Sequence, residues 1–197
     1  MNKFIYIFGT SCCGKSTLVR NVFHTDCEGN TNSLFPISDF KKMNCEFGIY
    51  SQSNGGRYIA VGRYDISCGG VDTINKFDDL RNLIIYLGEK NVDKNIMCER
   101  YFLNSFDRYI SLFDEVSNTH EVNVIFLTSS LAQLENRKKN RTGLIEVKMG
   151  YIEDTQKKIY KLKDKFLEDG RYKVFHIDTS NLNEDEVLRK FFELLQI

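Results

Sequence analysis

FIYIFGTSCCGKST, residues 4–17, is the stretch that decides the fold of this chain. The unbroken apolar run over 4–8 predicts a buried strand, and a glycine turn at Gly9 follows it directly. The residues from Gly9 to Ser16 match the pattern G-x-x-x-x-G-K-[ST] without a departure. A loop of this kind turns its backbone N–H groups inward around phosphate oxygens, and the next helix points its positive dipole end at the same anion. The sequence therefore predicts a phosphate-binding loop between a strand and a helix over about 15–23.

The residues of this loop have predicted contacts with a nucleotide and its metal ion. Lys15 is expected to reach the β- and γ-phosphates of ATP, and the Ser16 hydroxyl is expected to ligate Mg²⁺. Cys12 and Cys13 are either small loop residues or redox-sensitive thiols, because a helix N-terminus lowers a thiol pKa. ATP and Mg²⁺ are thus the expected cofactors. The predicted nucleotide-binding residues are Gly9, Thr10, Ser11, Cys12, Cys13, Gly14, Lys15, Ser16 and Thr17.

The rest of the chain alternates short apolar runs with longer helical periods, which is typical of βαβ units and a parallel sheet. Further strands are predicted at 95–98, 122–130 and 173–178. One helix is predicted over about 74–87, with Gly88 as its C-cap, and two more over about 103–113 and 146–168. A further helix is predicted to begin after the N-cap residue Ser130, and the last one lies at the end of the chain. Residues 45–64 predict a β-hairpin that turns at Asn54-Gly55.

The composition limits the possible settings of the protein. An apolar share of 42% and a charged share of 27% are ordinary for a soluble globule. The 27 basic and 27 acidic residues cancel, so no general attraction to polyanions is predicted. The six cysteines contain no CxxC pair, which argues against structural zinc, and no apolar run suits a signal peptide or a membrane span. We therefore expect a cytoplasmic protein with free thiols, and the oligomeric state stays open.

Two short motifs have the spelling found in GTPases. Residues 75–78, NKFD, match the N-K-x-D of a guanine-binding loop, and residues 26–29, DCEG, match the D-x-x-G of a γ-phosphate sensor. Neither follows an apolar strand, where both would stand in a GTPase, and residues 75–78 lie inside a helical pattern. A GTPase is therefore disfavoured, and a non-catalytic or regulatory P-loop nucleotide-binding protein is the alternative to an enzyme.

Two groups of charged residues favour a kinase. Glu99 ends the 95–98 strand, where a carboxylate can take a proton from an acceptor or orient Mg²⁺. Arg137 and Arg141 stand four residues apart, so both project from one helix face. Here the chain resembles small P-loop kinases, whose lid arginines neutralise charge on a transferring phosphoryl group. The alternatives are a surface Glu-Arg pair at 99–100 and a solvated basic helix face at 137–141.

In these motifs the chain resembles the P-loop nucleoside and nucleotide kinases. Deoxynucleoside kinases have Glu-Arg-Ser at the strand end and thymidylate kinases have Asp-Arg-Tyr, where this chain has Glu99-Arg100-Tyr101. The resemblance implies catalytic roles for Lys15, Glu99, Arg137 and Arg141, with Arg100 and Tyr101 at the acceptor. It implies an α/β, P-loop kinase-type three-layer fold with a central parallel sheet of about five strands and a helical lid at about 131–150. The inserted β-hairpin over 45–64 is a departure of this chain from those families. We expect one such domain over residues 1–197.

The acceptor is predicted from the segment over 62–73, GRYDISCGGVDT. In this segment the chain looks like the small phage-type kinases that phosphorylate 5-hydroxymethyluracil bases in DNA. That resemblance implies DNA modification, with Arg63 and Asp65 contacting the acceptor and Tyr64 stacking on a base. A free nucleoside or nucleotide is the alternative acceptor, and a glycine-rich turn that only closes the hairpin is the alternative role. Asp178 ends the last strand, and the loop over 178–180 is expected on the nucleobase side.

Overall fold

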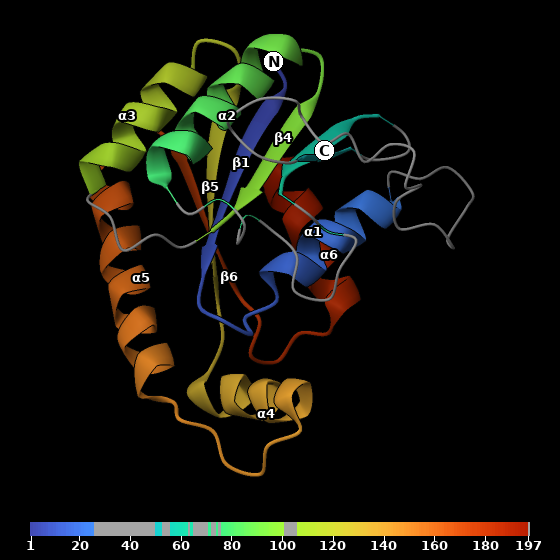
Figure 1. The fold of residues 1–197 in the computed structure, drawn as a ribbon, viewed down its shortest axis with the longest axis vertical. Helices are drawn as coiled ribbons and strands as arrows, with labels where there is room; N and C mark the ends of the chain where they lie inside the picture. Colours follow the sequence, from blue (N-terminus) through green and yellow to red (C-terminus); the bar gives the residue numbers. More distant parts are fainter. Residues whose placement is uncertain are drawn as a thin grey trace.

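The computed structural model of the protein describes residues 1–25, 50–52, 56–62, 64, 71, 74, 76–100 and 106–196. Within these residues, strands form one sheet in the order β2-β3-β4-β1-β5-β6 (Figure 1). Neighbouring strands from β3 to β6 in this order are parallel, and only β2 runs antiparallel to its neighbour β3. The five-stranded parallel sheet and the inserted hairpin predicted from the sequence are therefore confirmed. The strands are β1 (Lys3–Gly9), β2 (Tyr50–Gln52), β3 (Tyr58–Val61), β4 (Asn95–Glu99), β5 (Glu121–Thr128) and β6 (Lys173–Asp178).

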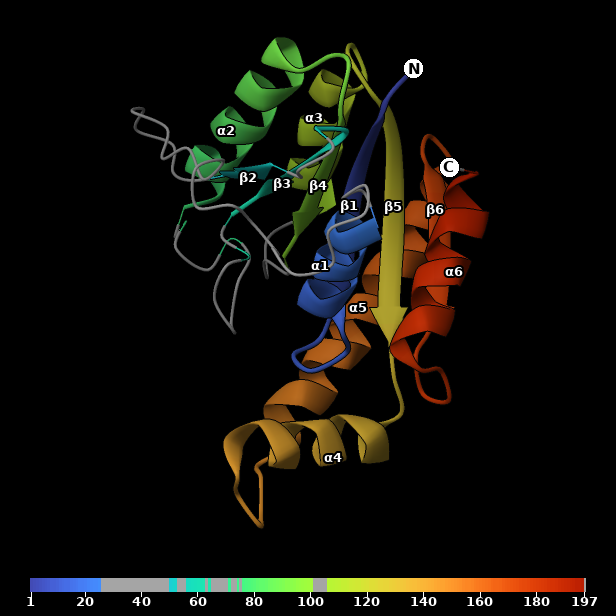
Figure 2. The same cartoon turned by 90° about the vertical axis from the view of Figure 1, so that its right-hand side faces the viewer.

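Helices cover both faces of this sheet, which gives the predicted three layers (Figures 1 and 2). One face packs against α1 (Lys15–Thr25) and α6 (Glu184–Leu195). The other face packs against α2 (Phe77–Lys90), α3 (Phe106–Val116) and α5 (Gly150–Asp169). Helix α4 (Leu131–Thr142) projects beyond the carboxyl ends of the strands (Figure 2). None of the helices in the described part of the chain is both long and apolar enough to span a bilayer.

Strand β1 lies at the centre because both of its faces are apolar. Phe4, Tyr6 and Phe8 point into the core beneath α2, α3 and α5, while Ile5 and Ile7 point into the core beneath α1 and α6. A strand that is buried on both faces reads as a continuous apolar run, as this one does. The buried strand predicted over 4–8 is confirmed.

Helix α2 corrects one detail of the sequence prediction. Gly88 does not end this helix, which continues to Lys90 and ends where the Asn91 N–H bonds to the Leu87 carbonyl at 3.0 Å. A Cβ atom on Gly88 would lie 3.1 Å from the Thr119 Oγ1 atom. The glycine thus permits close packing against a neighbouring turn, and it does not serve as a stop signal.

Helix α4 follows β5 and lies in the range, about 131–150, for which the sequence predicts a lid. Its first turn is capped by the Ser130 hydroxyl, which accepts a hydrogen bond from the Gln133 N–H, and Gly143 ends it at φ 69°. Leu134 is its one buried residue among those described. Because so little of α4 is packed against the core, most of its polar side chains lie on the surface beside the phosphate loop.

Candidate active site

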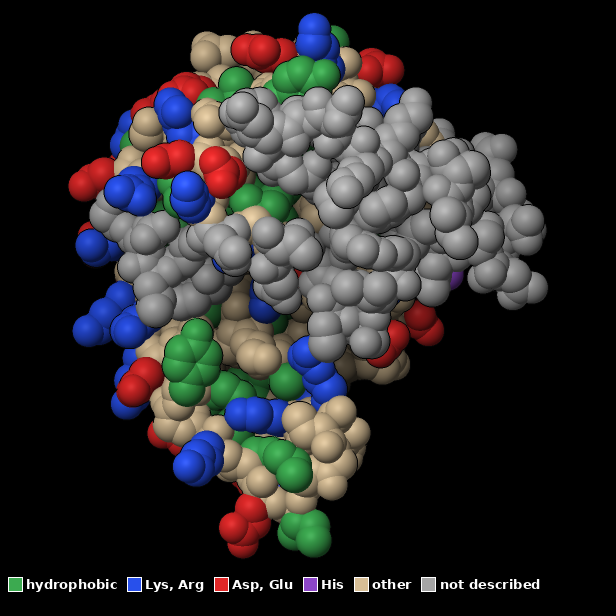
Figure 3. Space-filling model, viewed as in Figure 1, with side chains coloured by type: hydrophobic (Ala, Val, Ile, Leu, Met, Phe, Trp, Pro, Cys, Tyr) green, Lys and Arg blue, Asp and Glu red, His purple; other side chains and the backbone are tan. Residues whose placement is uncertain are grey.

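A cavity of about 620 Å³ lies at the carboxyl ends of β1 and β4. Its walls are the phosphate loop, the first turns of α1, the end of β4, helix α4, the start of α5 and the segment between β6 and α6. Figure 3 shows Lys and Arg side chains bordering the surface between α4 and the body of the molecule. All the predicted loop residues except Thr10 line this cavity. Ligands bind at this edge in open α/β sheets.

The phosphate loop has the tight geometry that its glycines require. A Cβ atom on Gly9 would lie 2.4 Å from the Cys13 Sγ and 2.7 Å from the Leu127 carbonyl oxygen, so only glycine fits there. Gly14 has φ 100°. Cys12 has φ 66°, a left-handed conformation that is uncommon for a residue with a side chain. The Lys15 Nζ donates to the Thr10 carbonyl at 2.9 Å, which curls the lysine over the loop.

The two cysteines of the loop differ in exposure. Cys13 is fully buried in the core beneath α1, and burial raises the pKa of its thiol while the charge of Lys15 opposes this shift. Cys12 is partly exposed and lines the cavity. Cys13 therefore acts as a packing residue, because a protonated buried thiol is a poor nucleophile. A redox role for Cys12 stays a prediction.

Glu99 is a buried carboxylate in the wall of the cavity. The parallel pairing of β1 with β4 sets Glu99 opposite Ile7, just before the loop, and leaves its side chain only 4% exposed. Its Oε1 accepts a hydrogen bond from the Ser16 hydroxyl at 2.5 Å. A carboxylate and a hydroxyl are hard oxygen donors of the kind that Mg²⁺ takes. The residues present therefore fit the expected metal ion.

Tyr64 lies beneath this carboxylate, in the core. Its ring is 1% exposed and packs near the ring of Phe23, with 6.3 Å between the centroids. Burial raises the pKa of Tyr64, and the negative charge of Glu99 raises it further. The ring has no face open to a nucleobase, so the stacking role predicted for Tyr64 is incompatible with this packing.

Two arginines reach from the cavity wall to the segment between β3 and α2. The Arg20 Nε donates to the Tyr64 carbonyl at 3.2 Å, and the Arg100 Nη1 donates to the carbonyls of Val71, at 2.5 Å, and Ile74. Both arginines line the cavity. Arg100 was predicted from the sequence, whereas Arg20 was missed. Its signal is its spacing, since a residue four positions after Ser16 lies on the same face of α1.

Arg137 joins the lid helix to the nucleotide site. Its guanidinium donates to the Thr179 carbonyl at 2.9 Å, to the Thr179 hydroxyl at 3.0 Å and to the Cys12 carbonyl at 3.5 Å. Arg141 also lines the cavity, where it is exposed. The predicted pair of lid arginines therefore faces one space, although Arg137 is held closer to the loop.

The loop after β6 contributes Thr179 to the cavity wall, and neither Asp178 nor Ser180 lies there. The Asp178 carboxylate accepts hydrogen bonds from the Ser180 N–H at 2.9 Å and from its hydroxyl at 2.5 Å, which lower the pKa of Asp178. Asp178 therefore shapes its own turn. Thr179 was not singled out within the predicted loop.

Several predicted residues lie outside the part of the chain that the structure describes. They are Arg63, Asp65 and Tyr101, together with the turn of the hairpin, the 26–29 motif and Asn75 of the 75–78 motif. Phe77 of that second motif begins α2 as a buried residue, and its ring meets Tyr109 at an interplanar angle of 88°. Phe77 and Asp78 are therefore helical, as expected, whereas Lys76 is the extended N-cap residue of α2.

Comparison with known proteins gives the fold an outside reference. No protein-family model matches the chain, and no curated protein is significantly similar to it in sequence. Among solved structures, the YorR protein of Bacillus subtilis in complex with phosphorylated GDP aligns with a TM-score of 0.54 at 14% identity, over 98% of this chain and 95% of that chain. A gluconokinase from Sinorhizobium meliloti aligns with a TM-score of 0.51 at 14% identity, over 98% and 91% of the two chains. At this level of identity the likeness shows a shared α/β fold.

Proposed function

We propose that this protein is an ATP- and Mg²⁺-dependent kinase that transfers the γ-phosphate of ATP to a hydroxyl or phosphate of a nucleoside- or nucleotide-type acceptor. The observation that carries the proposal is the 2.5 Å contact between Ser16 and Glu99, at the mouth of a phosphate loop. In this proposal the Glu99 carboxylate lies beside the transferring phosphoryl group. A structural neighbour that is itself a gluconokinase supports the same class of reaction on this fold.

In this proposal the donor nucleotide takes one orientation in the cavity. Its phosphates would lie in the loop, with Lys15 at the β- and γ-phosphates. Its base would point toward the segment between β6 and α6, where Thr179, Leu182 and Val187 line the wall. Arg137 bridges these two regions. When bound beside Ser16 and Glu99, Mg²⁺ would neutralise charge on the β- and γ-phosphates.

The residues on the other side of the phosphates would perform the transfer. An acceptor oxygen forms a bond to the γ-phosphorus, the bond from that phosphorus to the β–γ bridging oxygen breaks, and ADP leaves. Glu99 takes the proton of an acceptor hydroxyl or orients the acceptor. Arg137, Arg141 and Lys15 stabilise the charge that develops on the phosphoryl oxygens. Helix α4 excludes water from the transfer when it lies over the nucleotide.

Three acceptors fit the sequence: a free nucleoside, a nucleotide, or a 5-hydroxymethyluracil base in DNA. The DNA acceptor is supported by the 62–73 segment, of which the structure describes only Gly62, Tyr64 and Val71. The burial of Tyr64 removes one of its three proposed contacts. A non-catalytic nucleotide sensor is the alternative from a different class, and it would bind ATP without transferring phosphate to any acceptor.

The test is transfer of label from [γ-³²P]ATP to a panel of nucleosides, nucleotides, plain DNA and hydroxymethylated DNA. We expect label on one class of acceptor with the wild-type protein. Glu99→Gln should lower turnover by roughly 10² to 10⁴, the range for a positioned general base, while ATP affinity changes little. ATP binding without transfer to any acceptor would instead support the nucleotide sensor. Loss of ATP binding with normal turnover at saturation would make Glu99 a metal-orienting or structural residue.

A further inference from the structure

Tyr151, in the first turn of α5, brings an aromatic ring to the wall of the cavity. Among the residues that the structure describes, no other aromatic side chain lines this cavity. The Tyr151 side chain is 68% exposed, and no described residue bonds to its hydroxyl or stacks on its ring. A single exposed ring is common on protein surfaces, so its surroundings decide whether it has a ligand.

Thr155 supplies a polar group to the same wall, one helical turn after Tyr151. It is 5% exposed and lines the cavity. A threonine inside a helix can bond through its hydroxyl to the carbonyl one turn earlier. Within the described part of the chain, the Thr155 hydroxyl has neither that bond nor any other. Because buried polar groups are generally hydrogen-bonded, an unpaired hydroxyl at a cavity wall indicates a ligand with a polar edge.

The flank of α5 that carries Tyr151 faces away from the proposed site of the donor base. Tyr160 lies about two and a half turns later, on the opposite flank, and its ring centroid is 6.3 Å from that of His176 in β6. Lys165 lies about four turns after Tyr151, on nearly the same flank, and its Nζ is 5.9 Å from the ring centroid of Phe106 in α3. The donor base is proposed beside the segment that follows β6. Tyr151 therefore faces the α3 side, where an acceptor is expected.

We propose that Tyr151 stacks on the nucleobase of the acceptor, while the Thr155 hydroxyl bonds to a polar edge of that base. This inference rests on the proposed function, and it gives Tyr151 the stacking role for which the ring of Tyr64 is too deeply buried. Every base has a π-face, so a ring of this kind accepts any base, free or within a strand. A hydroxyl both donates and accepts, so it fits a carbonyl or an N–H of the base. An acceptor without a base would make neither contact.

The first test uses fluorescence, because the chain contains no tryptophan. Tyr151→Trp introduces a single indole, whose emission a stacked base quenches. The variant is first saturated with Mg²⁺ and a non-hydrolysable ATP analogue, which should leave the emission unchanged. It is then titrated with the four deoxynucleosides, their 5′-monophosphates, 5-hydroxymethyl-2′-deoxyuridine and a short single strand that carries one 5-hydroxymethyluracil. We expect saturable quenching by at least one of these probes and none by 2-deoxyribose 5-phosphate or gluconate. The probe that quenches at the lowest concentration identifies the source of the base.

Calorimetry with that probe then separates stacking from a structural role. Tyr151→Leu should weaken binding of the probe by about 5- to 150-fold, the range for loss of one base-stacking ring, while affinity for the ATP analogue is retained. Tyr151→Phe keeps the ring and should bind within about twofold of the wild type. Thr155→Val should weaken binding by about 2- to 10-fold, because it removes one hydrogen bond. Tyr160→Leu is the matched control, since it lies on the opposite flank of α5 and outside the cavity, and it should bind as the wild type does.

Three results would overturn the inference. In the first, no base-bearing probe quenches the indole, or the base-free probes quench it equally. In the second, the ATP analogue alone quenches it as strongly as any probe, which would assign Tyr151 to the donor base. In the third, Tyr151→Leu binds the probe as tightly as the wild type. Failure of the proposed function is distinct, since it would appear as absence of transfer from ATP to every acceptor and would leave the quenching measurement unaffected.

Discussion

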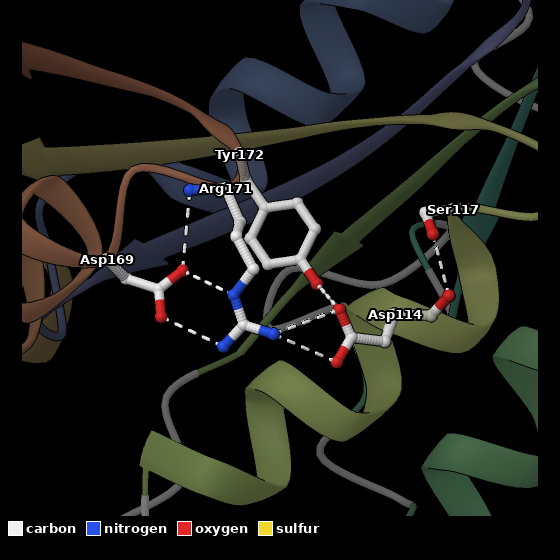
Figure 4. A network of polar contacts seen from close by, with 5 residues as sticks. All are labelled: Asp114, Ser117, Asp169, Arg171 and Tyr172. Carbon is white, nitrogen blue, oxygen red and sulfur yellow. Dashed lines mark hydrogen bonds and ion pairs between the residues drawn. The ribbon is translucent and has the colours of Figure 1, made fainter.

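Arginines are held in opposite ways at the two ends of the sheet. At the amino end of β6, Arg171 contacts the carboxylates of Asp169 at 2.7 Å and Asp114 at 3.1 Å, and the Tyr172 hydroxyl also bonds to Asp114 (Figure 4). At the carboxyl end, the hydrogen bonds of Arg137 go to neutral oxygens of Cys12 and Thr179. Two carboxylates neutralise the charge of Arg171, whereas the oxygens that Arg137 contacts are uncharged and leave its charge for the phosphates that we propose it binds. The charge of the partners, more than the number of hydrogen bonds, separates a structural arginine from a ligand-binding one.

The largest effect that tests this comparison is expected at Lys15, which also bonds to a neutral carbonyl. Lys15→Ala should lower phosphoryl transfer by at least about 10²-fold, because the lysine stabilises charge on the transferring group. The melting temperature should stay near that of the wild type, since the change removes one hydrogen bond to the loop. Steady-state kinetics and thermal unfolding measure the two quantities. Turnover within threefold of wild type would contradict the assignment of the phosphate loop.

A smaller loss is expected for each lid arginine. Arg137→Ala and Arg141→Ala should each lower turnover by about 10- to 100-fold and weaken ATP binding less, because both act on charge that grows in the transition state. Turnover at saturation and nucleotide titration distinguish the two effects. Thr179→Val is a useful companion to Arg137→Ala, since it removes one acceptor of the Arg137 guanidinium and leaves the arginine in place. Unchanged kinetics in both arginine variants would show that residues 137–141 are only a solvated basic helix face.

The substitution Arg171→Ala is expected to have almost no effect on turnover. Turnover should stay within about twofold of the wild type, because the residue lies at the far end of the sheet and is about half exposed, at 48%. Only a slight fall in melting temperature is expected, since water and salt screen exposed ion pairs. The same transfer assay and unfolding experiment apply. A large loss of activity would show that neutralised arginines can also be essential, which would break the comparison.

The smallest predicted effect is a change in acid stability. Hydrogen bonds from Arg171 lower the pKa of Asp169 below its ordinary value of about 3.9. A carboxylate with a lowered folded-state pKa adds stability above its unfolded-state pKa, and this stability is lost as the pH falls through the folded-state pKa. The wild type should therefore lose this contribution below about pH 4, and Arg171→Ala should lose less over the same window. Urea unfolding between pH 6 and 2 measures both curves, and parallel curves would contradict the assignment.

The sequence was sufficient for the elements whose signals are local. The phosphate loop follows from the spacing of Gly9, Gly14 and Lys15, and the hairpin follows from apolar arms around an Asn-Gly turn. The parallel sheet follows from runs that are apolar on both faces. These features depend on neighbours along the chain, so periodicity and turn chemistry were enough to predict them.

The features that escaped prediction depend on contacts between distant segments. Arg20 gains its place from the carbonyl of Tyr64, and Thr179 gains its place from Arg137. The burial of Tyr64 depends on Phe23 in another element, so a residue that reads as a stacking platform becomes part of the core. In the sequence Gly88 has the pattern of a helix C-cap, whereas in the structure its small size permits close packing against Thr119. These contacts join residues that are far apart in the sequence, and they depend on the order of strands and helices in the fold. A single sequence does not show that order.

The central position of β1 sets when the phosphate loop takes shape during synthesis. In this strand Phe4 pairs with Ile96 of β4, and Ile5 pairs with Asn123 of β5. At about 5–20 residues per second, the apolar strand is made several seconds before either partner, and both of its edges stay open in that interval. Loop-closure entropy opposes such long-range pairing until the partners exist. The phosphate loop is thus the first part of the proposed nucleotide site to be synthesised but one of the last to be completed. We therefore expect the nascent chain to gain affinity for ATP only after β5 has left the ribosome.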